Sequence, residues 1–296
     1  MKKTIFTGSG VAIVTPFNAD GSVNYDALGN MLEFQIENGT DAVIICGTTG
    51  EASTLTDDEQ ISVIEYTVNK VNKRIPVIAG AGSNDSAHGL KLCKRCEEVG
   101  ADGLLIVTPY YNKTTQKGLI KYYSDITNTV NLPIIMYNIA GRTGLNIAPK
   151  TVAELSKLDN IVAIKEASGN ISQVAEIAHL CGDRLDIYSG NDDQVLPLLS
   201  LGGKGVISVL ANVAPKYMHD MVMKYLNGDT AEATKMQLDC LDLVHGLFCE
   251  VNPIPVKAAL NLMGMQAGGY RPPLVEMEQA DLDMLEKSMR DFGLIK

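Results

Sequence analysis

Short apolar runs alternate with amphipathic segments eight times along this chain, and this repeat constrains its fold more than any other feature. The runs are rich in β-branched residues and apolar on both faces, which is typical of parallel strands covered by helices. Eight such units in series predict an α/β protein folded as a (β/α)8 TIM barrel. The expected strands are Val11–Thr15, Ala42–Cys46, Pro76–Ala79, Gly103–Thr108, Ile134–Asn138, Ile161–Lys165, Leu185–Ser189 and Gly205–Val209. The expected helices are Tyr25–Glu37, Asp57–Val71, Asp85–Val99, Gln116–Thr129, Pro149–Leu158, Ser172–Leu180, Gln194–Leu201 and Pro215–Leu226.

A doubly wound open sheet is the alternative, but such a sheet usually has fewer strands, and no G-x-G-x-x-G follows the first run. The pattern changes after Asn227-Gly228-Asp229, because from there it is helical through Asp281–Arg290. We therefore expect a catalytic barrel over residues 1–228 and a C-terminal helical region over residues 229–296.

Composition and charge exclude several classes of function. No apolar stretch approaches the ~18 residues needed to span a bilayer, and the N-terminus lacks the apolar core of a signal peptide. We therefore expect a cytoplasmic protein that does not bind membranes. The net charge is −10 and no basic cluster is present. Because phosphate contacts require a positive stripe, we expect no nucleic-acid partner.

The cysteine, histidine and glycine patterns indicate neither a metal nor a cofactor. Cys93 and Cys96 form a Cys-x-x-Cys, but within a helix-like run, where a buried helix face is the better interpretation. The four histidines are far apart in sequence. The two glycine-rich stretches lack the spacing of a phosphate-binding loop. They are Ala79–Ser83 and Leu201–Gly205.

Lys165 ends an otherwise apolar strand and is the first candidate for chemistry. An ammonium among apolar neighbours is poorly solvated, so its pKa falls and the neutral amine becomes available near pH 7. A lysine that forms a Schiff base needs this property. The alternative is a lysine at a strand end that points into solvent, and other residues must decide between the two.

Active sites of this fold lie at the C-terminal ends of the strands, and polar residues gather there. The run from Gly47 to Glu51 offers backbone N–H groups and two hydroxyls for a carboxylate or carbonyl oxygen. Tyr137 ends the fifth strand, and a phenol beside an amine can carry protons. Arg142 follows that strand and can clamp a carboxylate. A tight turn, a core tyrosine and a surface arginine are the alternatives. Because the Gly47–Glu51 run, Tyr137 and Arg142 all follow strand ends near Lys165, we predict a lysine-imine site.

The chain resembles the pyruvate-dependent class I aldolase superfamily, which contains N-acetylneuraminate lyase and dihydrodipicolinate synthase. The resemblance covers nearly the whole chain, and three motifs carry it: Gly47-Thr48-Thr49-Gly50-Glu51, Tyr137-Asn138 and Ile164-Lys165-Glu166-Ala167-Ser168-Gly169-Asn170. Thr48 and Arg142 favour the synthase branch, where the lyase typically has serine and lacks the cation. This branch implies a lyase that condenses pyruvate with L-aspartate 4-semialdehyde to 4-hydroxy-tetrahydrodipicolinate in diaminopimelate and lysine biosynthesis. A sugar-acid aldolase and a pyruvate-binding protein without activity remain as alternatives.

The resemblance also implies roles for individual residues. Lys165 corresponds to the residue that forms the imine with pyruvate, and Thr48 and Thr49 to those that hold its carboxylate. Thr49, Tyr137 and Tyr111 correspond to a proton relay, in which the neighbouring subunit supplies Tyr111. Arg142 corresponds to the residue that binds the semialdehyde carboxylate. The positions that border the site are Gly190 and the carbonyl of Ile207. A homo-oligomer is implied, with a homotetramer expected and a dimer as the alternative.

The chain departs from this family at two places. Ala140 stands where proline is usual in the loop before Arg142, which removes a constraint on that loop. Members inhibited by lysine bind it with histidines, an asparagine, a glutamate and a tyrosine at a subunit interface. Asn84 and Tyr110 match, but the other three positions differ. They are Asp57, Gln60 and His88. We therefore expect weak or absent feedback by L-lysine.

Overall fold

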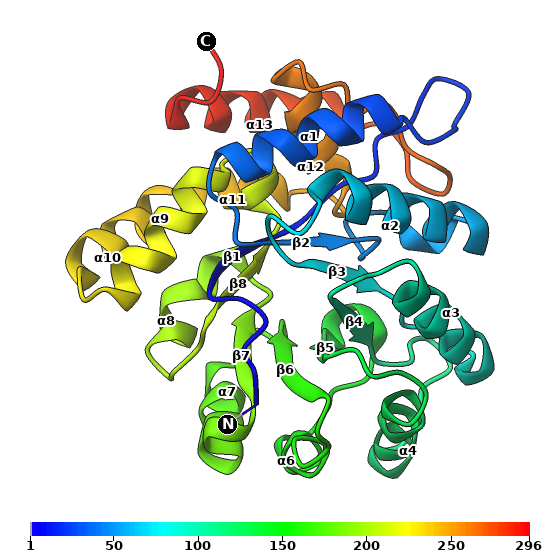
Figure 1. Cartoon of the computed structure of the whole chain (residues 1–296). Helices are drawn as coiled ribbons and strands as arrows, with labels where there is room; N and C mark the ends of the chain where they lie inside the picture. Colours follow the sequence, from blue (N-terminus) through cyan, green and yellow to red (C-terminus); the bar gives the residue numbers. More distant parts are fainter. Residues whose placement is uncertain (1) are drawn as a thin grey trace.

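The computed structural model describes residues 2–296, and its eight strands form one closed parallel barrel in chain order. Each strand pairs with the next, and the last pairs with the first. Figure 1 shows the helices as an outer layer around these strands, with the two chain ends at opposite edges of the view. The predicted TIM barrel is thus confirmed. The strands are β1 Gly8–Ala12, β2 Ala42–Ile45, β3 Val77–Gly80, β4 Gly103–Val107, β5 Ile134–Asn138, β6 Ile161–Glu166, β7 Asp186–Ser189 and β8 Gly205–Ser208.

Several of the helices begin at residues whose side chains accept hydrogen bonds from the first free N–H groups. Thr56 and Glu59 form a capping box at the start of α2, and Asn24, Asp85 and Asn170 cap α1, α3 and α7. The helices are α1 Tyr25–Glu37, α2 Asp57–Val71, α3 Ser86–Glu98, α4 Gln116–Thr127, α5 Ala140–Thr143, α6 Pro149–Leu155, α7 Ile171–Cys181, α8 Val195–Leu199, α9 Pro215–Leu226, α10 Thr230–Asp239, α11 Leu241–Leu247, α12 Ile254–Leu262 and α13 Gln279–Phe292. Short 3-10 helices are η1 Ala52–Thr54, η2 Gly182–Arg184, η3 Asp192–Gln194 and η4 Leu210–Asn212.

The first strand lies three residues earlier than the sequence pattern predicts. β1 begins at Gly8, which pairs with Gly205 of β8, and not at Val11. The two strands approach so closely that a Cβ on Gly205 would lie 1.9 Å from the carbonyl oxygen of Gly8. The glycines that make this approach possible have low strand propensity, so the pattern pointed to the apolar run that follows them.

Two layers of apolar side chains make up the core. The larger layer lies between the strands and the helices, and Cys93 and Cys96 of α3 are buried in it as expected. The smaller layer fills the barrel interior and includes Tyr137 and Tyr188. Phe6 stacks on Tyr188 with 4.3 Å between ring centroids, and the Tyr188 hydroxyl donates to the Phe6 carbonyl at 2.6 Å. The barrel interior is therefore a packed core.

The helices after α9 pack against the barrel through both apolar and polar contacts. Tyr217 of α9 donates to the carbonyl of Met236 at 2.7 Å and meets the ring of Phe292 edge-on at 4.9 Å. α12 carries Lys257, whose side chain is fully buried. In the described part of the chain, no helix is long and apolar enough to cross a membrane.

Candidate active site

Lys165 points into the C-terminal end of the barrel interior. It pairs in register with Tyr137 of β5 and Tyr188 of β7, and side chains at paired positions share one face of a sheet. Its Nζ lies 4.4 Å from the centroid of the Tyr137 ring. Burial lowers the pKa of Lys165 to about 8; Arg142 lowers it as well, whereas Asp192 raises it. The amine can therefore lose its proton close to neutral pH.

The space that Lys165 occupies exists because residue 190 is a glycine. A Cβ on Gly190 would lie 2.9 Å from Cε of Lys165 and 2.7 Å from Cβ of Ala167. The Gly190 N–H donates to the carbonyl of Glu166 at 2.8 Å, which holds the backbone against β6. Gly190 therefore borders the lysine directly. Ile207 of β8 is fully buried and belongs to the same interior layer as Tyr137.

Tyr137 carries a phenol that stays protonated. Burial raises its pKa to about 12, against the opposing effects of Arg142 and the Thr48 side chain. A neutral phenol beside an amine of lowered pKa forms a pair that can exchange a proton with a bound molecule. Lys165 and Tyr137 are thus brought together as expected from their strand-end positions.

The turn after β2 presents its two threonines to different surroundings. Thr48 is exposed and neighbours the Tyr137 phenol, whereas Thr49 is buried. The Thr49 hydroxyl accepts a hydrogen bond from Nδ2 of Asn252 at 3.0 Å. The Thr48 side chain is hydrogen-bonded to the Tyr137 phenol, so Thr48 is the threonine placed directly beside Tyr137. This differs from the sequence analysis, which assigned Thr49 to the relay.

A buried ion pair fixes the end of this turn. Glu51 has a left-handed backbone with φ of 53°, and its Oε1 lies 2.8 Å from Nζ of Lys257. The Lys257 ammonium also donates to the carbonyl of Thr15 at 3.1 Å, and its centre lies 4.3 Å from the Phe17 ring. Since a buried charge needs a partner and hydrogen bonds, this arrangement constrains the turn and α12 together. The sequence analysis missed it.

Arg142 lies on a four-residue helix, α5, and not in a loop as expected. The guanidinium is exposed, and its Nη2 donates to the backbone carbonyl of Asn252 at 3.4 Å. Ala140 is the first residue of α5, a position where the N–H has no helical partner and proline would also fit. The segment is held instead by hydrogen bonds from the N–H groups of Arg142 and Thr143 to the Ile139 carbonyl.

A cluster of buried and half-buried amides and a buried carboxylate anchors the segment beyond Arg142. Asn138 donates to Glu166 at 2.9 Å and to Asn146 at 2.8 Å, and accepts from the N–H of Ile147 at 3.0 Å. Gln173 completes the cluster through bonds to Asn146 and Glu166. Glu166 is therefore committed to structure, although it adjoins Lys165 in sequence.

The side chain of Tyr111 projects into solvent. Its side chain is 92% exposed and its backbone is left-handed with φ of 58°. The N–H of the preceding residue, Tyr110, donates a hydrogen bond to Oδ1 of Asn84 at 2.7 Å. Within one chain, Tyr111 thus lies on the rim of the site and is not packed against Lys165.

A cavity of about 780 Å³ opens over this end of the barrel. Its walls combine the turn after β2, the two tyrosines after β4 and the α5 segment. The predicted residues that line it are Thr48, Tyr111, Tyr137 and Arg142. Lys165, Thr49 and Ile207 are buried and are not among its lining residues.

Asp192 is a further residue that the sequence analysis left out of the site. It is buried in η3, and its Oδ2 accepts from the N–H groups of Val209 at 3.0 Å and Leu210 at 2.9 Å. Burial raises its pKa, while Lys165 is among the groups that lower it. An aspartate after a Ser-Gly-Asn turn is an ordinary loop residue in sequence, so only the fold shows its closeness to Lys165.

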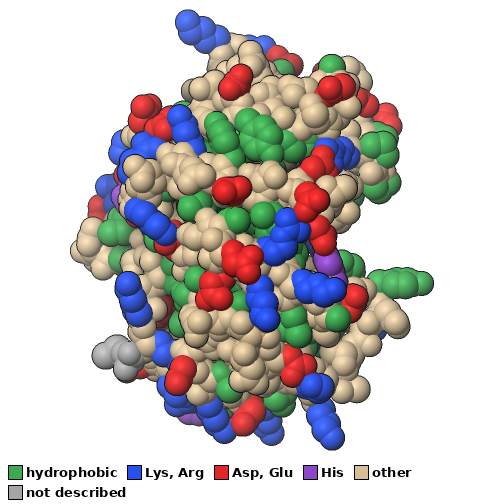
Figure 2. Space-filling model, turned by 45° about the vertical axis from the view of Figure 1, so that its right-hand side comes forward, with side chains coloured by type: hydrophobic (Ala, Val, Ile, Leu, Met, Phe, Trp, Pro, Cys, Tyr) green, Lys and Arg blue, Asp and Glu red, His purple; other side chains and the backbone are tan. Residues whose placement is uncertain are grey.

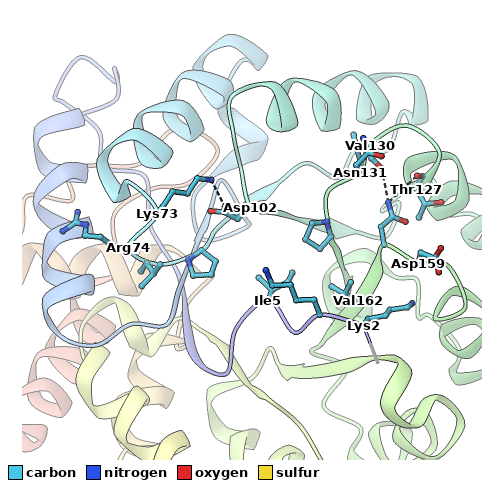
Figure 3. Close-up of a pocket in the computed structure, with 15 residues that line it drawn as sticks. Lys2, Ile5, Lys73, Arg74, Asp102, Thr127, Val130, Asn131, Asp159 and Val162 are labelled. Carbon is cyan, nitrogen blue, oxygen red and sulfur yellow. Dashed lines mark hydrogen bonds and ion pairs between the residues drawn. The ribbon is translucent and has the colours of Figure 1, made fainter.

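The opposite end of the barrel has a larger cavity, of about 920 Å³, below the N-terminal ends of β3 to β6. Figure 3 shows Lys73 paired with Asp102 there, and their atoms lie 2.7 Å apart. Lys2 donates to the carbonyls of Ser156 and Ile161 at 2.6 Å. Because these cations already have partners, and because this end of the fold serves stability, we assign no chemistry to it.

Charges on the surface do not form a binding stripe in the view that Figure 2 gives. Acidic and basic side chains alternate over that face, with no continuous basic patch. Among residues 2–296, no group of three or more histidine, cysteine, aspartate or glutamate side chains is arranged to hold a metal ion.

Comparison with known proteins places the chain in a family. The model of the dihydrodipicolinate synthetase family matches residues 5–291. The 4-hydroxy-tetrahydrodipicolinate synthase of Acetivibrio thermocellus is 58% identical over 295 residues, which cover 100% of both chains. The dihydrodipicolinate synthase of Thermotoga maritima has a TM-score of 0.96 at 42% identity, covering 99% of this chain and 100% of that one. The chloride-inhibited dihydrodipicolinate synthase of Acinetobacter baumannii, in complex with pyruvate, has a TM-score of 0.96 at 41% identity, with coverage of 99% and 100%. This chain belongs to the dihydrodipicolinate synthetase family.

Proposed function

We propose that this protein is a lyase that condenses pyruvate with L-aspartate 4-semialdehyde to give 4-hydroxy-tetrahydrodipicolinate, a step in diaminopimelate and lysine biosynthesis. The observation that carries the proposal is the buried Lys165, whose pKa falls to about 8, in register with the phenol of Tyr137. The relatives support the choice of substrates, because they bear the name of this activity and one of them holds pyruvate.

The first step is formation of the imine. The neutral amine of Lys165 attacks the keto carbon of pyruvate, and the resulting carbinolamine loses water to give the iminium. Tyr137 donates a proton to the departing hydroxyl and recovers one through Thr48, which neighbours the phenol. At pH 8 about half of the Lys165 amine is neutral, against well under 1% for a lysine with an ordinary pKa.

The carbon–carbon bond forms in the second step. Loss of a proton from the pyruvate methyl group gives an enamine, which attacks the aldehyde carbon of the semialdehyde, and the aldehyde oxygen takes up a proton from the relay. The amino group of the semialdehyde then attacks the imine carbon and displaces Lys165, which closes the ring. No external oxidant or reductant is needed.

Two sets of groups bind the two carboxylates. Thr48 and Thr49 hold the pyruvate carboxylate, and the carbonyl of Ile207 and the backbone of Gly190 border the bound molecule. Arg142 pairs with the carboxylate of the semialdehyde at the mouth of the cavity, where its guanidinium is exposed. A neutral pocket would leave that second carboxylate without a partner.

We further propose that the protein is a homo-oligomer, with a homotetramer expected and a dimer as the alternative. The support is the exposed aromatic pair after β4, because Tyr111 is 92% exposed and Tyr110 41% exposed. Rings as large as these are usually buried against a partner. A second copy that covers the rim would bring its own Tyr111 to the relay. Sedimentation of the wild type and of Tyr111→Ala tests whether assembly depends on this contact.

A substrate panel tests the proposed reaction. The purified enzyme should condense pyruvate with aspartate semialdehyde and should be inactive in cleaving N-acetylneuraminate or 2-keto-3-deoxygluconate. Rapid cleavage of either sugar acid without condensation would overturn the assignment in favour of a sugar-acid aldolase.

A further inference from the structure

Asn252 joins the two parts of the site that bind carboxylates. It lies just before α12, far from both in sequence, and its side chain is buried. Its Nδ2 donates to Oγ1 of Thr49 at 3.0 Å, and its backbone carbonyl accepts from Arg142 at 3.4 Å. No role for Asn252 followed from the sequence.

The hydrogen bond between Asn252 and Thr49 has a direction. An amide nitrogen can only donate, so the Thr49 oxygen is the acceptor in this pair. The hydroxyl proton of Thr49 must then point away from Asn252. A carboxylate is acceptor-only and needs such a proton. Donation into the Thr49 oxygen also polarises its O–H bond and strengthens what that group donates onward.

We propose that Asn252 is a positioning residue that holds the Thr49 hydroxyl as a hydrogen-bond donor to the pyruvate carboxylate. This inference rests on the proposed function, since it assumes that Thr49 binds that carboxylate. It assigns the residue a specific effect on pyruvate, while the backbone bond to Arg142 survives any change of the Asn252 side chain.

The surroundings of Asn252 argue against a purely structural role. Its Oδ1 is buried and has no hydrogen-bond partner among residues 2–296. A buried oxygen without a partner weakens a fold. By contrast, the buried Asn212 uses both ends of its amide, because Oδ1 accepts from the N–H of Val14 and Nδ2 donates to the carbonyl of Ala12. Among residues 2–296, the one side-chain hydrogen bond of Asn252 goes to Thr49.

A buried ion pair lies close in sequence to both Asn252 and Thr49. Lys257, five residues later, is locked by its ion pair with Glu51 of the same turn that presents Thr49. The donor and the acceptor of the Asn252–Thr49 bond are therefore both fixed to one buried ion pair. A small shift of the α12 end would move Thr49 and Asn252 together.

A double-mutant cycle tests the proposal. The proteins are the wild type, Asn252→Ala, Thr49→Val and the double variant. Asn261→Ala is the control, because Asn261 lies on α12 and its side chain bonds, among the described residues, only to Gly268. The readouts are KM for each substrate, kcat, and the pyruvate concentration that gives half-maximal borohydride trapping at Lys165. Thermal unfolding verifies that each variant folds.

Asn252→Ala should raise KM for pyruvate about tenfold, equivalent to ~1.4 kcal/mol, and should leave KM for the semialdehyde within about twofold. In the Thr49→Val background the same change should have no further effect on pyruvate. Asn252→Asp, which has nearly the same shape but only accepts, should turn the Thr49 proton away and raise KM for pyruvate more than alanine does. The Asn261→Ala control should match the wild type.

Three results would overturn the inference. They are additive effects of Asn252→Ala and Thr49→Val, equal effects on both substrates, and an Asn252→Asp variant closer to the wild type than Asn252→Ala. If instead the wild type forms no imine with pyruvate, the proposed function fails and the inference fails with it. Trapping in the wild type with unchanged pyruvate affinity in Asn252→Ala overturns the inference alone.

Discussion

Gly190→Ala is the change that probes the placement of Lys165 most sharply. The added Cβ would lie 2.9 Å from Cε and 3.2 Å from Cγ of Lys165, and 2.7 Å from Cβ of Ala167. Carbon atoms in ordinary contact stay ~3.5–4.0 Å apart, so at least ~0.6 Å of movement is needed. Ala167 directly follows β6 and its N–H donates to the Asn138 carbonyl at 2.9 Å, whereas Lys165 has a flexible side chain. Relief of the Ala167 contact requires a shift of the backbone at residue 190, and the flexible lysine side chain must move as well.

A displacement of that size should affect catalysis far more than stability. Misplacement of a reacting group by ~1 Å can cost ~10²-fold in rate. Overpacking a core costs ~1–3 kcal/mol, which for a chain of this size lowers Tm by only several degrees. We expect kcat/KM to fall by ~10²-fold, together with the rate at which borohydride traps pyruvate on Lys165.

Steady-state kinetics, single-turnover trapping and thermal unfolding measure these effects. Gly141→Ala is the matched control, because Gly141 lies at the mouth of the same cavity and a Cβ there would meet nothing within 4 Å. The control should keep wild-type rates. A Gly190→Ala enzyme that traps pyruvate at the normal rate would refute the idea that this glycine sets the position of the amine.

Three further predictions follow from the same geometry. Asp192→Asn removes a charge that raises the pKa of Lys165, so the pKa of the amine should fall below about 8. The pH profile of imine trapping should therefore move to lower pH, and an unchanged profile would show that Asp192 does not act on the amine. Arg142→Ala should raise KM for the semialdehyde about tenfold to a hundredfold and KM for pyruvate much less, because a charge-assisted contact contributes ~1.5–3 kcal/mol; equal changes would mark Arg142 as structural. L-lysine should inhibit weakly or not at all, because His88 is paired with Asp57 at 2.8 Å and the Gln60 side chain donates inward to the Gly80 carbonyl. The assay varies lysine at subsaturating pyruvate, and strong inhibition at submillimolar lysine would contradict the prediction.

The features that the sequence predicted well are those that depend on local pattern. The helices Tyr25–Glu37, Asp57–Val71 and Pro215–Leu226 begin and end where their amphipathic period and capping residues indicate. Strand ends were equally informative, since Lys165 and Tyr137 each close an apolar run and therefore meet at one end of the barrel. The register between β5 and β6 was not predicted, because it shifts between Ile134 and Ile135.

The features that the sequence could not predict depend on contacts between distant residues. Asn252 and Thr49 are 203 positions apart, and Lys257 and Glu51 are 206 apart, so no local pattern links them. Gly8 was missed for another reason, because close approach of two strands selects glycine against its own propensity. The hydrogen bond between Thr48 and Tyr137 was also beyond the sequence, since it joins the turns after two different strands.

Reduction with borohydride in the presence of pyruvate tests the lysine imine most directly. Peptide mapping by mass spectrometry should find a reduced pyruvyl adduct on Lys165, and the modified enzyme should be irreversibly inactive. Lys165→Ala should take up no adduct and should lose nearly all turnover. An unmodified Lys165 in an enzyme that still condenses both substrates, or an adduct on another lysine that accounts for the inactivation, would contradict the mechanism.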